Sequence, residues 1–155
     1  MIRINTGDLL CVNGKNKYYY VLILDKTSLF GGQLCYVYHK TTTCIIDADE
    51  IINSKDGFYE IIDFIWAKRE NNINKLKSNI DIKSLKDKLK FYKQSFTLIG
   101  KADKWRILDL EGNQIKIVDH LNSEQKKYPL YHRIDTFIMM DLVEKEWLPE
   151  KDERI

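Results

Sequence analysis

Histidine and cysteine are the residue types in this chain best suited to acid–base, nucleophilic or metal chemistry, and there are three of each. They are His39, His120, His132, Cys11, Cys35 and Cys44. No histidines are spaced as H-x-x-x-H and no cysteines as C-x-x-C, so the sequence predicts no zinc site. On one strand face, Cys35 and His39 would lie roughly 13 Å apart at about 3.3 Å per residue, too far for a catalytic hydrogen bond.

Other signatures of catalysis are also missing from the sequence. There is no G-x-S-x-G nucleophile motif and no G-x-x-x-x-G-K-[ST] phosphate-binding loop. The cysteines lie in apolar stretches that predict buried free thiols, and His120 and His132 are expected at the surface. We therefore expect no enzyme activity, no cofactor and no metal.

The charges are unevenly distributed, although the formal net charge is only +2. Between Lys68 and Lys93 there are nine basic and three acidic residues, whereas the C-terminal tail from Asp141 to Ile155 is acidic. Lysine far outnumbers arginine, which argues against sequence-specific nucleic-acid readout. The lysines fit the solvated face of a helix better than a nucleic-acid surface.

The elements that would position these residues begin with strands. In the stretch "NGKNKYYYVLIL", residues 13–24, Asn-Gly is a strong hairpin signal, and the following residues predict a strand that is apolar on both faces. Tyr18 and Tyr20 would share one face, with Tyr19 on the other. The tyrosines are therefore expected in a sheet core and not on a stacking platform for bases. With a third strand over 33–40, this region favours a small SH3-like barrel.

The rest of the chain predicts both helices and strands. Residues 58–70 fit either a strand or a helix. Residues 71–93 predict a lysine-rich amphipathic helical region, with Asp81 as an N-cap. A hairpin is expected over residues 104–119, and a last strand over 132–147 that passes into a short terminal helix.

These elements together predict a single α+β domain over residues 1–155. Most of it would be an antiparallel, small barrel-like sheet, joined by one lysine-rich amphipathic helix and a short C-terminal segment. The N-terminus lacks the charged and apolar parts of a signal peptide, and no apolar run approaches the roughly 20 residues that span a membrane. We therefore expect a cytoplasmic protein that has no membrane partner.

Three short motifs follow one another along the chain. They are Gly7-Asp8 before an apolar strand, Ile99-Gly100-Lys101 within "FTLIGKADKW", and Trp147 followed by Pro149-Glu150, Asp152 and Arg154. In this order they resemble the immunity protein 26 family of bacterial polymorphic toxin systems. The resemblance implies a protein that binds and neutralises a cognate toxin, and it carries over no catalytic residue. The chain departs from the family at Val12-Asn13, where a proline is often found, and over residues 69–94.

The resemblance leaves the toxin-binding surface open. An acidic toxin would meet the lysine-rich helix, where the candidate residues are Lys86, Lys90 and Lys93. A basic toxin would meet an acidic patch, either the group Asp47, Asp49 and Glu50, which is typical of a solvated loop or a helix start, or the acidic tail. The alternative hypothesis is a nucleic-acid-binding module built from the barrel and the basic helix, whose binding would weaken steeply as salt rises.

Overall fold

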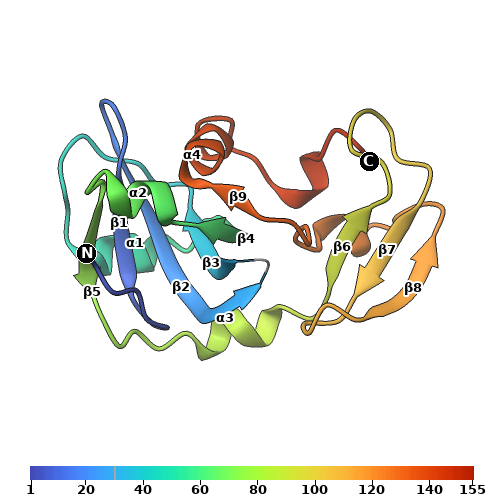
Figure 1. The fold of residues 1–155 in the computed structure, drawn as a ribbon, viewed down its shortest axis with the longest axis horizontal. Coiled ribbons are helices and arrows are strands. Elements are labelled where there is room, and N and C mark those ends of the chain that lie inside the picture. Colours follow the sequence, from blue (N-terminus) through green and yellow to red (C-terminus); the bar gives the residue numbers. More distant parts are fainter. Residues whose placement is uncertain (30) are drawn as a thin grey trace.

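The chain forms two β-sheets that lie next to each other (Figure 1). A computed structural model describes residues 1–29 and 31–155, with the side chains of all of these except 27–29. The strands are β1 (Leu9–Asn13), β2 (Tyr18–Leu29), β3 (Gly32–Tyr38), β4 (Gly57–Asp63), β5 (Ile73–Lys77), β6 (Tyr92–Ser95), β7 (Trp105–Leu108), β8 (Gln114–Val118) and β9 (Ile134–Asp135). The helices are α1 (Ala48–Ser54), α2 (Ile65–Arg69), α3 (Lys83–Lys88) and α4 (Thr136–Glu144), with short 3₁₀ helices at Gln125–Lys127 and Pro149–Lys151.

Sheet A has the strand order β5-β1-β2-β3-β4-β9, and sheet B has the order β6-β7-β8. All neighbours are antiparallel except β4 and β9, which run parallel, so sheet A is mixed. The α+β prediction is confirmed. The barrel prediction is wrong, because no closed barrel forms among the described residues and β5 and β9 are the two edges of an open sheet.

The first hairpin follows the sequence pattern. The amide of Gly14 donates to the carbonyl of Lys17 at 2.8 Å, and β1 then pairs with β2 up to Leu9 opposite Leu22. Tyr20 is buried on one face of the sheet and Tyr19 on the other, as the alternation predicts. These aromatic rings therefore belong to the core.

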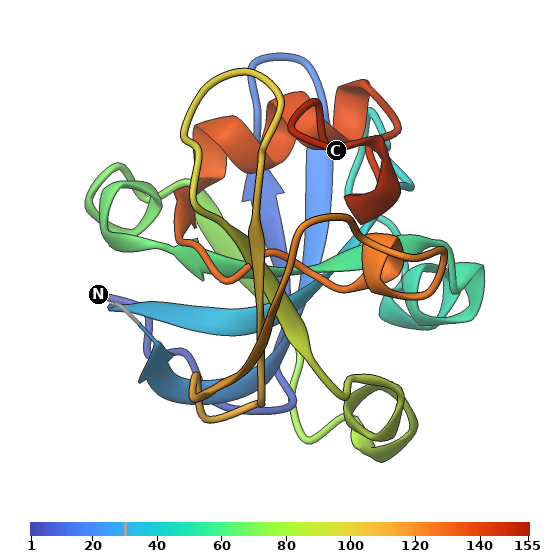
Figure 2. The same cartoon turned by 90° about the vertical axis from the view of Figure 1, so that its right-hand side faces the viewer.

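Both faces of sheet A are covered, because its strands are apolar on both sides. One face packs against α2 and α4, which contribute Ala67, Met139 and Val143 to its core. The other face packs against Ile51 of α1, partly buried side chains of α3, and residues of sheet B. Figures 1 and 2 show α4 and α3 on opposite sides of the molecule.

The ambiguous segment 58–70 contains both elements that its sequence suggested. It continues β4 to Asp63 and then turns into α2 at Ile65. The change occurs where the Asp63 carboxylate accepts a hydrogen bond from the backbone N–H of Ile65 at 2.8 Å. A side chain that satisfies a free N–H at a helix start favours a helix at that point.

The prediction of helix over residues 71–93 is largely wrong. Only α3 is helical there. Its N-cap is Ile82 and not the predicted Asp81, although the Asp81 carboxylate accepts a hydrogen bond from the N–H of Lys83 at 3.0 Å. Before α3, β5 pairs with β1, and after it β6 pairs with β7. Asn71 and Asn79 have positive φ angles of 53° and 58°, which interrupt any continuous helix. Long-range strand pairing has overridden local helix propensity.

The C-terminal third confirms one prediction and corrects another. The hairpin expected over 104–119 is present as β7 and β8, with Gly112 at a φ of 87° in its loop. The last strand, expected over 132–147, is only the two residues of β9, and α4 follows at once. Asp135 caps this helix by accepting from the N–H of Ile138 at 2.9 Å. In the part of the chain described, no helix has the length and apolar character needed to cross a membrane.

Candidate functional site: a groove between α2 and α4

Large apolar side chains that remain exposed point to a surface with a function. Trp66 on α2 and Phe137 on α4 are 56% and 63% exposed. Their neighbours Ile65 and Ile138 are also exposed. Exposing a large aromatic side chain to water is more unfavourable than exposing most other side chains. An exposed pair of this size is therefore unusual unless a partner covers it.

The two aromatic residues are brought together by the parallel pair of β4 and β9. In this pair Asp63 lies opposite Asp135, and each is the last residue of its strand. Asp135 then caps α4, and Asp63, one residue before the N-cap Phe64, accepts a hydrogen bond from the first N–H of α2. Two neighbouring strands thus end at the same level and lead into two helices. Trp66, in the first turn of α2, and Phe137, in the first turn of α4, therefore flank the same space.

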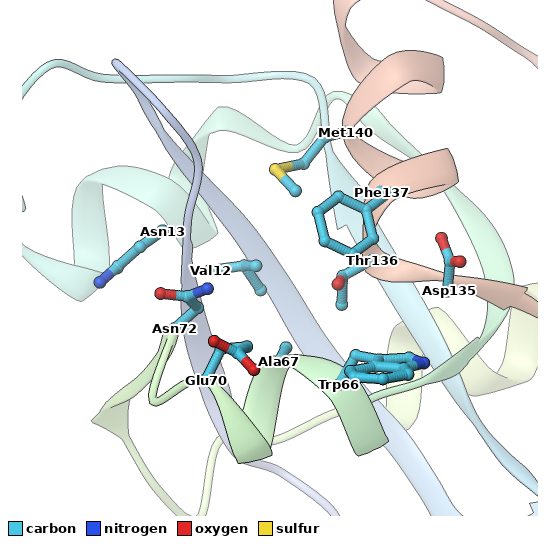
Figure 3. Close-up of a pocket in the computed structure, with 10 residues that line it drawn as sticks. All are labelled: Val12, Asn13, Trp66, Ala67, Glu70, Asn72, Asp135, Thr136, Phe137 and Met140. Carbon is cyan, nitrogen blue, oxygen red and sulfur yellow. The ribbon is translucent and has the colours of Figure 1, made fainter.

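That space is a groove of about 530 Å³ (Figure 3). It is lined by Val12, Asn13, Trp66, Ala67, Glu70, Asn72, Asp135, Thr136, Phe137 and Met140. In Figure 3 the Trp66 ring lies below Phe137 and Thr136, and Met140 lies beyond Phe137. The end of β1, together with Ala67, completes the wall on the side of the sheet. The groove combines an aromatic mouth with a small number of polar groups, as binding sites commonly do.

The electrostatics of the groove are one-sided. Glu70 and Asp135 are the ionisable residues among its lining, and both are acidic. Outside the lining, the guanidinium of Arg69 lies 5.5 Å from the centre of the Trp66 ring. A guanidinium at this distance is attracted to the indole ring by a cation–π interaction.

The acidic residues predicted as an interface lie elsewhere. Asp47, Asp49 and Glu50 come together at the start of α1 and are exposed. Asp47 caps α1 by accepting from the N–H of Asp49 at 2.8 Å, and Asp49 forms an ion pair with Lys77 at 2.9 Å. Because α1 packs on the opposite face of sheet A from α2 and α4, this patch and the groove are separate surfaces.

Of the three lysines predicted as a toxin contact, two are exposed and one is buried. Lys86 and Lys90 are exposed, on α3 and just after it. Lys93, in contrast, belongs to β6 and has no exposed surface, so its prediction as a toxin contact is wrong. Its ammonium group donates to the backbone carbonyls of Lys126 at 2.5 Å and Pro149 at 2.7 Å. Lys93 thus links β6 to two later segments of the chain.

Two of the histidines have carboxylate partners. Nε2 of His132 lies 3.0 Å from the buried Glu60 carboxylate, and burial raises the pKa of Glu60. Nδ1 of His39 lies 3.2 Å from Asp56, while its Nε2 is 2.8 Å from the carbonyl oxygen of Trp147. Neither histidine lines the groove. Among the described residues, no group of three or more histidine, cysteine or carboxylate side chains could hold a metal ion.

The cysteines differ from one another in burial. Cys11 and Cys35 are buried as expected, whereas Cys44 is exposed, contrary to the prediction. Burial raises the pKa of Cys11 to about 11 and also raises that of Cys35. Both thiols are therefore protonated at neutral pH and are poor nucleophiles.

Sequence reasoning missed the groove because its residues come from distant segments. Trp66 lies in the segment 58–70, which fitted either a strand or a helix, and Phe137 lay in a region predicted to begin as a strand. One signal was present, since Asp63 and Asp135 are each followed within three residues by an aromatic side chain. Comparisons with protein-family models, curated proteins and solved structures gave no match to this chain.

Proposed function

We propose that this protein binds a partner protein through the groove between α2 and α4, and that the partner is a bacterial toxin that it neutralises. The main evidence for this binding surface is the exposed pair Trp66 and Phe137 at the mouth of the groove. The nature of the partner rests on the motifs that resemble the immunity protein 26 family.

The composition of the groove favours a protein partner. Tryptophan and tyrosine, with arginine, dominate the residues that contribute most to protein–protein binding, and they act at the centre of a patch from which water is expelled. Trp66 and Phe137 provide such a centre, and Glu70, Asn72 and Asp135 provide polar groups around it. An interface of this kind needs no catalytic residue, which agrees with the absence of a catalytic motif in the sequence.

Co-expression in a bacterial host tests the proposal. A candidate toxin domain, sought first in the reading frames next to this gene, is induced with and without the protein, and growth is measured. We expect the protein to restore growth. If the host grows no better with the protein than without it, neutralisation of that toxin is excluded.

Paired variants then test the surface. We expect Trp66→Ala with Phe137→Ala to abolish the rescue. The matched control is Ile115→Ala with Ile117→Ala on β8, where the side chains are 53% and 48% exposed. The control should rescue growth as the wild type does. Full rescue by the Trp66→Ala, Phe137→Ala variant, with protein present at normal levels, would place the binding surface elsewhere.

A further inference from the structure

The groove offers negative charge and no positive charge to a partner. Glu70 is exposed, and its carboxylate has no hydrogen bond or ion pair within the described residues. Asp135 uses Oδ1 to cap α4, and no partner is found for its Oδ2 in the described part of the chain. A partner that covered this groove with an apolar side chain would bury both carboxylates without compensation, which is unfavourable.

The aromatic side chains that line the groove further restrict which chemical group of a partner can bind there. The guanidinium of Arg69 already lies 5.5 Å from the centre of the Trp66 ring. Arg69 is not among the residues that line the groove. The Trp66 ring does line it, and lies below Thr136 and Phe137 in Figure 3. A planar cation stacks on the face of such a ring, and its N–H groups can reach carboxylates at the ring edge.

We infer that the groove receives an arginine side chain that projects from the partner protein. Its guanidinium stacks on Trp66 beneath Phe137 and donates hydrogen bonds to Glu70, while Asp135, on the opposite side of the ring in Figure 3, adds negative charge. Arginine fits better than lysine because its planar fork suits both an aromatic face and a carboxylate, whereas an ammonium group is a compact, strongly hydrated charge. The inference rests on the proposed function, because it names the chemistry of the partner at that same groove.

Short peptides test the chemistry of the groove without the toxin. The probes are acetyl-Gly-Arg-Gly-amide, its lysine counterpart and its citrulline counterpart, which has the shape of arginine without the charge. Binding is followed by NMR through the indole N–H signals of the three tryptophans. The signal of Trp66 is assigned from its loss in Trp66→Phe.

We expect the arginine peptide to shift the Trp66 signal with weak, millimolar affinity, as a small ligand would. The citrulline peptide should bind at least about tenfold more weakly, and Glu70→Gln should weaken arginine binding by about tenfold, because a charge-assisted hydrogen bond is lost. Binding should also fall as salt rises. Equal shifts with arginine and citrulline, or no shift of Trp66, would overturn the inference.

The toxin complex separates this inference from the proposed function. We expect Glu70→Gln with Asp135→Asn to weaken the complex, since asparagine still caps α4 but carries no charge. If Trp66→Ala with Phe137→Ala abolishes rescue while the neutral variant retains wild-type affinity, the binding surface stands and the arginine inference fails. If the arginine peptide binds but no toxin is neutralised, the chemistry of the groove stands and the proposed function fails.

Discussion

Lys93 shows how a single buried charge makes stability depend on pH. Its ammonium group has no exposed surface, and burial lowers its pKa to about 8 even though Asp152 and Glu150 favour the charged form. In the unfolded chain the pKa returns to its ordinary value of 10.5. Between these two values the unfolded chain binds more protons than the folded one. The unfavourable contribution of Lys93 is therefore complete below about pH 8 and is relieved as pH rises.

We expect Lys93→Met to remove this pH dependence. Relative to the variant, the wild type should gain about 1 kcal/mol in free energy of unfolding between about pH 7 and pH 9. Urea unfolding at the two pH values measures the difference. Lys90→Met is the matched control, because Lys90 is exposed and should leave the pH dependence as it is. An equal gap between wild type and Lys93→Met at both values would contradict the prediction.

Glu60 and His132 provide a second test at the residue scale. Burial raises the pKa of Glu60, and the hydrogen bond and charge of His132 act against that rise. We expect His132→Ala to lower the free energy of unfolding by about 2 kcal/mol at neutral pH, because a buried carboxylate loses its partner. A protonated carboxyl group needs no such partner, so the loss should grow as pH rises through the pKa of Glu60 in the folded protein, which burial raises above 4.5.

The double variant Glu60→Gln with His132→Ala controls for this prediction. It removes the charge together with its partner, so it should recover part of the lost stability at neutral pH. Chemical unfolding near pH 5 and pH 7 gives the comparison. If the double variant were less stable than His132→Ala at neutral pH, the buried charge would not be the cause.

Sequence reasoning misplaced Lys93 and gave no sign of the partner of His132. The sequence predicts Lys93 on the polar face of a helix, whereas the side chain is buried. His132 was expected at the surface, where 35% of its side chain is indeed exposed, but its contact with the buried Glu60 was not predicted. Their partners lie 56 and 72 residues away along the chain, at Pro149 and Glu60. A local pattern contains no information about such contacts. By contrast, Tyr19 and Tyr20 were placed correctly, because strand alternation alone decides which face each occupies.

At the scale of elements, α4 has one face that packs into the core and another that is exposed at the proposed binding groove. Met139 and Val143 point into the core, and Met139 has no exposed surface. Phe137 and Ile138 point outward on the same helix. The helix needs the first pair for its packing, whereas the second pair contributes little to the fold. This division allows the proposed interface to be changed without loss of the structure.

We expect Met139→Ala to lower the free energy of unfolding by about 3 kcal/mol, because it opens a cavity in the core. Phe137→Ala should change it by less than about 1 kcal/mol, since the ring is largely exposed and alanine is the better helix former. Thermal and urea unfolding of the two variants measure both values. A loss as large for Phe137→Ala as for Met139→Ala would show that Phe137 is a core residue and not part of a free surface.

Elements stabilised by local interactions were predicted from the sequence, and the others were not. The β1–β2 and β7–β8 hairpins are adjacent in sequence and have glycine-containing turns, so both were expected. β5 exists because it pairs with the distant β1, and local propensity predicted helix there. β9 lies within the strand predicted over 132–147, but local propensity gave no sign of its short length or of its parallel pairing with β4. The candidate groove depends on the β4–β9 pair, which explains why the sequence did not reveal it.

For the whole molecule, the distribution of charge separates the two hypotheses about partners. α3 carries three lysines and one aspartate, whereas α4 carries two acidic residues and no basic one. The two helices lie on opposite sides of the molecule (Figures 1 and 2). A nucleic acid would be drawn to α3, and a basic partner protein to the groove beside α4. Charge changes on each side should therefore affect different partners.

We expect Lys86→Glu with Lys90→Glu to leave toxin neutralisation unchanged, whereas Glu70→Lys should abolish it. The first variant removes the attraction of α3 for an acidic surface, and the second introduces repulsion at the groove. Growth rescue and measured affinity for the toxin at low and high salt test both variants. If only the Lys86→Glu, Lys90→Glu variant loses rescue, α3 is the functional surface. A gel-shift with RNA and DNA then becomes the deciding measurement. Retardation that disappears between low and physiological salt is expected for a nucleic-acid-binding module and not for a toxin-binding groove.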